Sequence, residues 1–249
     1  MLTSAILAVA LLSPQGEPVT AKSIIEKMLQ RYAGASSLNG TITLTQSAQN
    51  VKIVTQTSVA FEKPSKILIL QKQGGSAPRS SILVSNGEKF FFTKPEQLIS
   101  RNDYLGELVK PDSRPAQTVG DLYAIAAAGL PDRSPVLDLV IARREDMAYC
   151  ISQLRTREYA GKTQLGTLSL HLVKGKWKQN ELIESNTGDY ELYISDSGDL
   201  VRYVLRQTFG VPGADGKPTG QTVEVVNTWD TSVAVNTPVK PGTFALRTH

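Results

Sequence analysis

The amino-acid sequence predicts an α+β protein made mainly of antiparallel strands, with a single curved sheet that forms an unclosed β-barrel, or half-barrel. Three observations predict this fold class. One amphipathic helix precedes a long series of segments that alternate apolar and polar residues. Short turn sequences join most of these segments, and connections of that length favour antiparallel pairing. One apolar helical insert, at about residues 117–142, interrupts the series. About ten strands are expected, and a sheet of that size must curl.

The first residues have the pattern of a targeting segment. Residues 5–12 form an apolar run as long as the hydrophobic region of a signal peptide, and too short to span a bilayer. No Lys or Arg precedes the run, which leaves a buried strand or helix as the alternative. We expect residues 1–19 to direct export and residues 20–249 to form a single domain.

An amphipathic helix is expected directly after this segment. Thr20 is a residue type that caps helix N-termini, and Gly34 is typical of the position just past a helix end. Between them, apolar residues recur at helical spacing on one face: Ile24, Ile25, Met28, Leu29 and Tyr32. This face needs a partner surface, which the sheet would provide.

Five strands are expected in the first half of the chain, at residues 41–45, 51–61, 66–71, 82–84 and 90–92. Pro64 ends the second of them. Residues 66–71 are apolar on both faces, so we expect this strand to be covered on both sides. Asn86-Gly87 between two apolar runs predicts a tight β-hairpin.

The middle of the chain predicts two apolar helices. Val119–Leu130 lacks strand-like alternation and ends at Gly129-Leu130-Pro131. Ser134 can cap a second helix at Val136–Ile141, with Pro135 in its first turn. These helices are either core elements packed on the sheet or a lid over a cavity, and the sequence leaves both open.

Five further strands are expected at residues 147–158, 166–172, 190–194, 201–208 and 222–230. Residues 196–199, Asp-Ser-Gly-Asp, have the composition of a hairpin turn. Residues 210–220 are rich in Gly and Pro and predict a long, mobile hairpin loop.

One face of the sheet is expected to line a hydrophobic cavity that binds a ligand. The strand residues assigned to it are Ile42, Leu44, Phe61, Phe90, Phe92, Leu168, Leu170, Leu172, Tyr193, Tyr203, Leu205 and Trp229. The lid over this cavity would use apolar residues of the two middle helices: Leu122, Tyr123, Ile125, Leu130, Val136, Leu137 and Val140.

The charge distribution argues against a nucleic-acid binder. The net charge is +4 and the pI is about 9.1, but Lys and Arg are spread along the chain rather than gathered in one stripe. The densest group is Lys174, Lys176 and Lys178 around Trp177, which we expect at a solvated hairpin tip.

Signatures of catalysis and of metal binding are also missing from the sequence. Cys150 is the only cysteine, and it is expected to pack as a small hydrophobe; a nucleophilic pair with His171 is the alternative. The acid pairs Asp196/Asp199 and Glu181/Glu184 are expected to be turn formers. We therefore expect no catalytic residue, no metal and no cofactor.

Three stretches carry a resemblance to a known family. They are Ile24–Tyr32 running into Leu38–Thr41, then Phe61–Pro64 with the hairpin Val84–Phe92, and finally Tyr190–Ile194 continuing through Gly198–Arg202. In this order they resemble the lipoprotein-carrier (LolA/LolB-like) superfamily and its exported relatives. The resemblance extends over nearly all of residues 20–249, and it consists of turn and strand residues.

The resemblance implies an unclosed β-barrel that holds a hydrophobic cavity under a helical lid. In such families the cavity takes acyl chains of lipoproteins or glycolipids, lid movement accompanies loading and release, and no reaction is catalysed. The chain departs from the pattern in its long loop at residues 210–220 and in its aromatic content of 6%. These departures leave the cargo open.

The function expected from the sequence is therefore that of a periplasmic or otherwise exported, non-catalytic monomer that carries a lipid-like apolar ligand. Its partners would be lipid or lipoprotein acyl chains, with room for a protein of the inner or outer membrane. No nucleic acid is expected as a partner, and no membrane span after removal of the signal segment. The alternative is an envelope protein-interaction or stress-sensing module of the same fold, without a lipid cargo.

Overall fold

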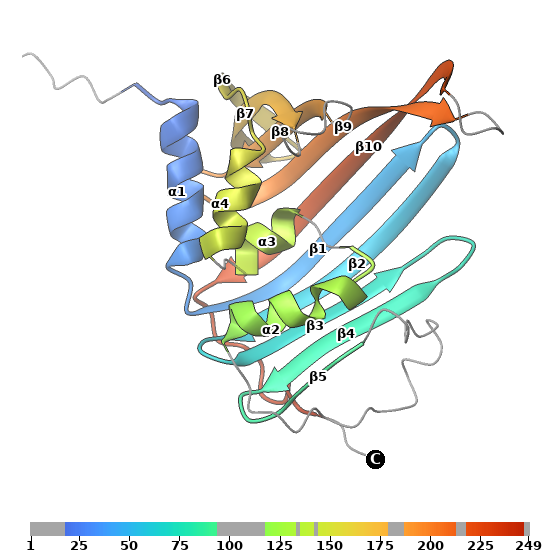
Figure 1. Ribbon diagram of the computed structural model, residues 1–249. Coiled ribbons are helices and arrows are strands. Elements are labelled where there is room, and N and C mark those ends of the chain that lie inside the picture. The colour runs from blue at the N-terminus through green and yellow to red at the C-terminus, as the bar shows by residue number, and fades with distance from the viewer. Residues whose placement is uncertain are drawn as a thin grey trace, which may run out of the picture.

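The computed structural model describes residues 18–93, 118–132, 135–141, 144–178, 187–212 and 218–246. Within these ranges, ten strands form one antiparallel sheet in the order β5-β4-β3-β2-β1-β10-β9-β8-β7-β6. Figure 1 shows the sheet curving around the helices without closing, which confirms the predicted half-barrel. The strands are β1 (Ser37–Ala48), β2 (Val51–Glu62), β3 (Lys66–Gln73), β4 (Arg79–Asn86), β5 (Phe90–Phe92), β6 (Glu158–Leu165), β7 (Leu168–Lys178), β8 (Thr187–Ile194), β9 (Leu200–Pro212) and β10 (Pro218–Val235).

The sheet consists of two meanders, β1–β5 and β6–β10, joined in the middle by the first and the last strand. β1 pairs with β10 over eleven residue pairs, from Leu38 opposite Val235 to Ala48 opposite Val225. The Asn86-Gly87 hairpin pairs β4 with β5 as predicted, with Ser85 opposite Phe90. The edges of the sheet are β5 and β6, and the chain between these two strands supplies helices to the concave face (Figure 1).

Helix α1 (Ala21–Ala33) lies against the β8–β9 end of the sheet, where its apolar face is buried. Thr20 caps it through a capping box with Ser23, as the sequence predicts for Thr20. Tyr32 is fully buried, and its hydroxyl accepts a hydrogen bond of 2.9 Å from the backbone N–H of Leu200. Arg31 forms an ion pair of 2.9 Å with Asp199 in the β8–β9 turn. These contacts tie the first helix to the second meander.

The central insert contains α2 (Val119–Ala126), the short 3-10 helix η3 (Ala127–Gly129), α3 (Pro135–Ile141) and α4 (Arg144–Ser152). The strand predicted at residues 147–158 is wrong, because these residues form most of α4 and the turn after it. The edge strand is β6, which starts where that prediction ends. Helices α2, α3 and α4 lie in the concavity of the sheet (Figure 1).

The concave face is defined by rows of paired residues. One row runs through Val173, Leu192, Tyr203, Trp229 and Leu44 on five successive strands, all buried. Successive residues of a strand point to opposite faces, so this row fixes the inward side of β7–β10 and β1. Together with α1 and the insert, these residues form a continuous hydrophobic core.

Two other predictions about the second meander need correction. Lys174, Lys176 and Lys178 do not lie at a hairpin tip: they belong to β7, where they alternate with Val173, Gly175 and Trp177. The strands β9 and β10 extend to Pro212 and from Pro218, so both ends of the predicted 210–220 loop are strand, and residues 213–217 lie outside the described residues. The four central strands β1, β2, β9 and β10 therefore reach beyond the helices (Figure 1).

None of the helices in the described ranges combines the length and apolar character needed to cross a bilayer. The predicted targeting run at residues 5–12 lies outside the described residues.

Candidate functional site

A cleft of about 650 Å³ lies between helices α3 and α4 and the concave face of β7, β9 and β10. The helices contribute one wall and the strands the other. Its apolar and aromatic lining residues are Pro135, Tyr149, Cys150, Trp177, Leu205, Phe209 and Trp229, and its polar ones are Asp138, Gln153, Gln207 and Asn227. The volume falls in the range of small-molecule pockets, which are mostly apolar with a few convergent polar groups.

The helical wall of the cleft is held by polar contacts. Asp138 of α3 accepts a hydrogen bond of 2.7 Å from the hydroxyl of Tyr123 in α2, and the thiol of Cys150 in α4 lies 3.6 Å from its other carboxylate oxygen. Gln153, just past α4, accepts a hydrogen bond of 3.3 Å from the indole nitrogen of Trp177. These contacts fix α2, α3, α4 and β7 relative to one another.

Gly175 lets the chain after α4 cross β7 closely. A Cβ atom at this position would lie 2.0 Å from the carbonyl oxygen of Thr156, so only glycine fits. The crossing is held by backbone hydrogen bonds from Arg155 N to Lys176 O at 2.8 Å and from Lys178 N to Gln153 O at 3.0 Å. This crossing closes the cleft beside β7 and turns the chain into β6.

A buried carboxyl group, that of Asp132, lies near two residues that line the cleft, Trp229 and Asp138. The side-chain amide of Gln71 donates to the carbonyl of Asp132 at 2.7 Å and accepts from its N–H at 3.0 Å, which holds the connection between η3 and α3. Burial raises the pKa of the Asp132 carboxyl from 3.8 to about 7; the neighbouring Trp229 indole opposes this rise, and Asp138 adds to it.

The structure brings only part of the predicted cavity lining to this cleft. Leu205 and Trp229 line it. The other predicted residues on the concave face are buried in the hydrophobic core or packed against it: Ile42, Leu44, Phe61, Phe90, Tyr203 and, at its margin, Phe92. Whether these core residues ever contact a ligand stays a prediction.

Four predicted residues of β7 and β8 do not lie on the concave face as expected. Leu172 is paired with Tyr193, one position out of phase with the inward pair Val173 and Leu192, so both point to the opposite face. Leu168 and Leu170 share the phase of Leu172 along β7. Leu168 is 50% exposed at the β6–β7 turn, and Leu170 is buried outside the main core.

The predicted lid residues all lie in the insert against the concave side. Most of them are fully buried in the core: Leu122, Tyr123, Val136, Leu137 and Val140, with Leu130 nearly so. Ile125 is half-buried. Sequence reasoning missed lining residues from α3, α4, β7, β9 and β10: Pro135, Asp138, Tyr149, Cys150, Gln153, Trp177, Gln207, Phe209 and Asn227. Those of α4 were missed because residues 147–158 were assigned to a strand.

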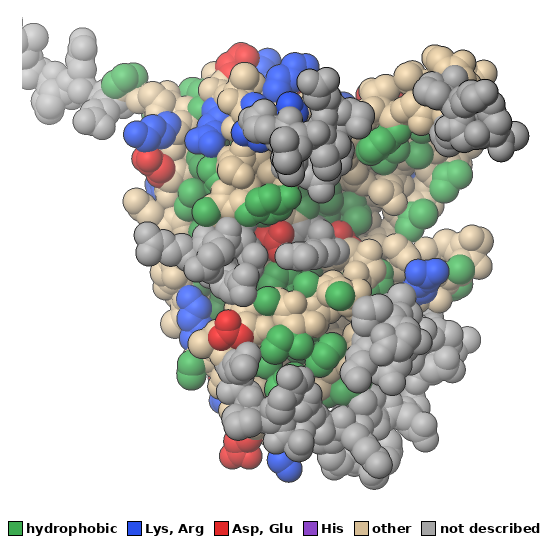
Figure 2. Space-filling model, viewed as in Figure 1, with side chains coloured by type: hydrophobic (Ala, Val, Ile, Leu, Met, Phe, Trp, Pro, Cys, Tyr) green, Lys and Arg blue, Asp and Glu red, His purple; other side chains and the backbone are tan. Residues whose placement is uncertain are grey.

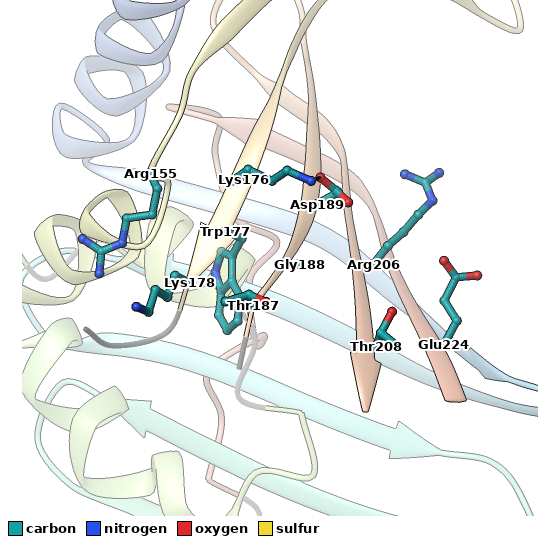
Figure 3. A pocket seen from close by; sticks show the side chains of 10 residues that line it. All are labelled: Arg155, Lys176, Trp177, Lys178, Thr187, Gly188, Asp189, Arg206, Thr208 and Glu224. Carbon is teal, nitrogen blue, oxygen red and sulfur yellow. Dashed lines mark hydrogen bonds and ion pairs between the residues drawn. The ribbon is translucent and has the colours of Figure 1, made fainter. Parts of the chain in front are cut away.

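A second hollow, of about 410 Å³, lies beside β7–β10 near the end of β7 (Figure 3). Its lining carries charges of both signs, and several are paired. Lys176 reaches across to Asp189 (Figure 3), and Arg206 pairs with Glu191 at 2.9 Å. Trp177 lines both hollows. The paired charges fit a solvated surface better than a binding site.

The residues considered for chemistry are dispersed. His171 contacts the Tyr159 hydroxyl at 3.0 Å and Asp196 at 2.8 Å, whereas Cys150 lies beside Asp138, so the alternative Cys150–His171 pair is not formed. Glu181 and Glu184 lie outside the described residues. In the part of the chain that the structure describes, no group of three His, Cys, Asp or Glu residues could hold a metal ion.

Comparison with known proteins gives matches among solved structures, at low sequence identity. LprF from Mycobacterium bovis matches with a TM-score of 0.43 and 11% identity, over 90% of this chain and 97% of that one. The MucA/MucB complex of Pseudomonas aeruginosa matches with a TM-score of 0.40 and 9% identity, over 90% of this chain and 60% of that one. The LolA superfamily protein NE2245 from Nitrosomonas europaea matches with a TM-score of 0.33 and 12% identity, over 92% and 98% of the two chains.

No protein-family model and no curated protein matches the chain. The lipoprotein-carrier superfamily that the sequence resembles is thus also represented among the solved structures that match the chain.

Proposed function

We propose that this protein is a non-catalytic carrier of a lipid-like apolar ligand, which it holds in the cleft between α3–α4 and β9–β10. The observation that carries the proposal is the lining of that cleft, in which four aromatic side chains border one hollow together with Leu205: Tyr149, Trp177, Phe209 and Trp229. Two of its lining residues are also unusually exposed for their type, Tyr149 at 52% and Phe209 at 40%. Exposed apolar side chains that border a groove are typical of ligand or partner sites.

The distal concave face would extend the cleft. Phe209 is paired with Val223, and Ala48 pairs with both Val225 and Val51, all on strand positions that share the inward phase. Figure 2 shows hydrophobic side chains at the surface around the protruding ends of these strands. An acyl chain that leaves the cleft would continue along this apolar surface.

Burial alone would give such a ligand useful affinity. Each methylene group removed from water contributes roughly 0.8 kcal/mol, so a chain of about 14 carbons supplies ~10 kcal/mol before the losses that accompany association. This is enough for reversible carriage. Export to the cell envelope and exchange of cargo with a membrane protein are parts of the same proposal, as the sequence suggests.

The test is a cleft variant with an exposed control. Phe209→Asp places a charge at the rim of the cleft, at a position exposed enough for the fold to tolerate it. We expect a fluorescent fatty-acyl probe to bind this variant about tenfold more weakly than wild type, because a charge cannot share the apolar surface with the chain. The measurement is a fluorescence titration of purified protein.

Leu168→Asp is the matched control. Leu168 is 50% exposed at the β6–β7 turn and does not line the cleft. Probe affinity should therefore equal that of wild type. Equal losses of probe affinity in the two variants would show that the cleft is not the binding site. If wild type bound no probe, the alternative would be favoured, which is an envelope protein-interaction module that uses the exposed apolar strand ends.

A further inference from the structure

The polar lining of the cleft includes two amide side chains whose nitrogen atoms have no partner. Gln153, just past α4, and Asn227 of β10 are 7% and 8% exposed, and both line the cleft. Neither the Nε2 atom of Gln153 nor the Nδ2 atom of Asn227 donates a hydrogen bond to the part of the chain that the structure describes. Amides that are nine-tenths buried and lack a partner are uncommon in folded proteins, since each carries a desolvation penalty.

The oxygen atom of each amide already accepts a hydrogen bond, which fixes the orientation of the group. The indole of Trp177 can only donate, so the Oε1 atom of Gln153 faces it at 3.3 Å and the Nε2 atom is directed elsewhere. The Oδ1 atom of Asn227 accepts from the side chain of Gln46 at 3.0 Å. Among the described residues, the sealed polar atoms without a partner include neither nitrogen, so both reach the surface of the cleft. The helical wall and the strand wall thus each present one NH₂ donor.

The charge of the lining selects among the acceptors that these donors can bind. Among the described residues, Asp138 is the only acidic residue that lines the cleft, and no Lys or Arg lines it. A carboxylate or a phosphate would accept from the amides, but it would bring a further negative charge into the cleft, and no cation of the described lining would offset it. The carbonyl oxygen of an ester accepts hydrogen bonds and carries no charge. An ester carbonyl therefore matches both the donors and the charge of the lining.

We infer that the cleft takes an esterified acyl chain, whose carbonyl oxygen accepts a hydrogen bond from Gln153 Nε2 or from Asn227 Nδ2. The inference rests on the proposed function and adds a chemical selectivity to it. The protein would prefer an acyl ester to a free fatty acid or to an alkyl ether of equal chain length. The apolar lining alone would supply affinity without this selectivity.

The experiment compares three ligands of one chain length as competitors of a bound fluorescent acyl probe. Methyl tetradecanoate has a neutral carbonyl group, methyl tetradecyl ether has none, and tetradecanoate is an anion. In a mildly alkaline buffer we expect wild type to bind the ester about fivefold more tightly than either of the others. The double variant Gln153→Met/Asn227→Leu should abolish that preference while the probe still binds through the apolar lining.

The two single variants show which amide contacts the ester, because the preference is lost only with the donor that makes the hydrogen bond. Circular dichroism checks that each variant is folded. Gln153→Met also removes the acceptor of the Trp177 indole. If this change unfolds the protein, Gln153→Glu takes its place, since it keeps an oxygen for Trp177 and loses the NH₂ donor.

Leu205→Met is the matched control, since it alters the apolar lining at the residue paired with Asn227 and leaves both amides in place. It should keep the preference for the ester, whatever it does to the affinity for all three ligands. If wild type bound the ester no more tightly than the ether or the acid, the inference would be overturned and the carrier function would stand. A preference that survives in the double variant would overturn it as well, whereas failure of wild type to bind the probe at all would remove the proposed function.

Discussion

At the level of single residues, the carboxyl group of Asp132 is strongly affected by its surroundings. Its backbone is clamped by Gln71, while its carboxyl group is buried beside Trp229 and Asp138. Burial raises the pKa of this carboxyl from 3.8 to about 7, so near neutral pH it exists in both protonation states. A carboxyl group placed in this way reduces the stability of the fold at neutral pH.

This pKa predicts how stability depends on pH. The folded state holds the Asp132 proton up to about pH 7, whereas the unfolded chain releases it near 3.8. Between these two values the folded state binds more protons, so the free energy of unfolding falls as pH rises, by roughly 1.4 kcal/mol per pH unit for one group. Asp132→Asn should remove this fall and make the variant more stable than wild type at about pH 7.

Urea denaturation at several pH values measures the effect. Glu88→Gln, which removes an exposed carboxyl in the β4–β5 turn, is the control and should leave the wild-type pH dependence in place. If the free energy of unfolding of Asp132→Asn depended on pH as that of wild type does, the raised pKa assigned to the buried Asp132 carboxyl would be wrong.

Among the elements, the central insert decides where the cleft lies. Gln71 of β3 holds the chain before α3, and Gly175 of β7 admits the close approach of the chain after α4. Figure 1 shows the insert filling one part of the concavity while the ends of β1, β2, β9 and β10 continue past it. The cleft is the region where the insert stops and the concave face continues.

The Gln71 clamp should make a measurable contribution to stability. Gln71→Ala removes two hydrogen bonds to Asp132 and one of 3.2 Å to Thr57, all buried. We expect the free energy of unfolding to fall by about 3 kcal/mol, because buried partners are left unsatisfied. Chemical denaturation measures this. Gln73→Ala, on the same strand with a single contact of 3.5 Å to Thr55, should lower it by less than about 1 kcal/mol.

Local patterns predict some elements of this fold well and others poorly. The capped helix after Thr20 and the Asn86-Gly87 hairpin follow from short-range preferences, and both are present. The residues of α4 alternate enough to resemble a strand, and their helical state depends on packing against α3 and β7, which no local pattern records. In β7, apolar residues occur on both faces of the strand. The sequence therefore led us to place Leu168, Leu170 and Leu172 on the concave face, which Val173 and Trp177 occupy instead.

In the whole molecule, one open sheet connects the two halves of the chain through β1 and β10. The half-barrel could be predicted because ten alternating segments and short turns leave few other architectures. The position of the cleft could not be predicted, because its lining comes from five elements: α3, α4, β7, β9 and β10. How these elements approach one another depends on the close contact at Gly175 and on the register of the second meander. Only two of the twelve predicted cavity-lining residues, Leu205 and Trp229, line it.

We propose that this molecule binds an apolar ligand in that cleft with defined stoichiometry. Native mass spectrometry of the detergent-free protein, after incubation with vesicles of a bacterial lipid extract, tests it most directly. We predict a lipid adduct on wild type and on Leu168→Asp, and a strongly reduced one on Phe209→Asp. An apo mass for wild type, or equal adducts on all three proteins, would contradict the account.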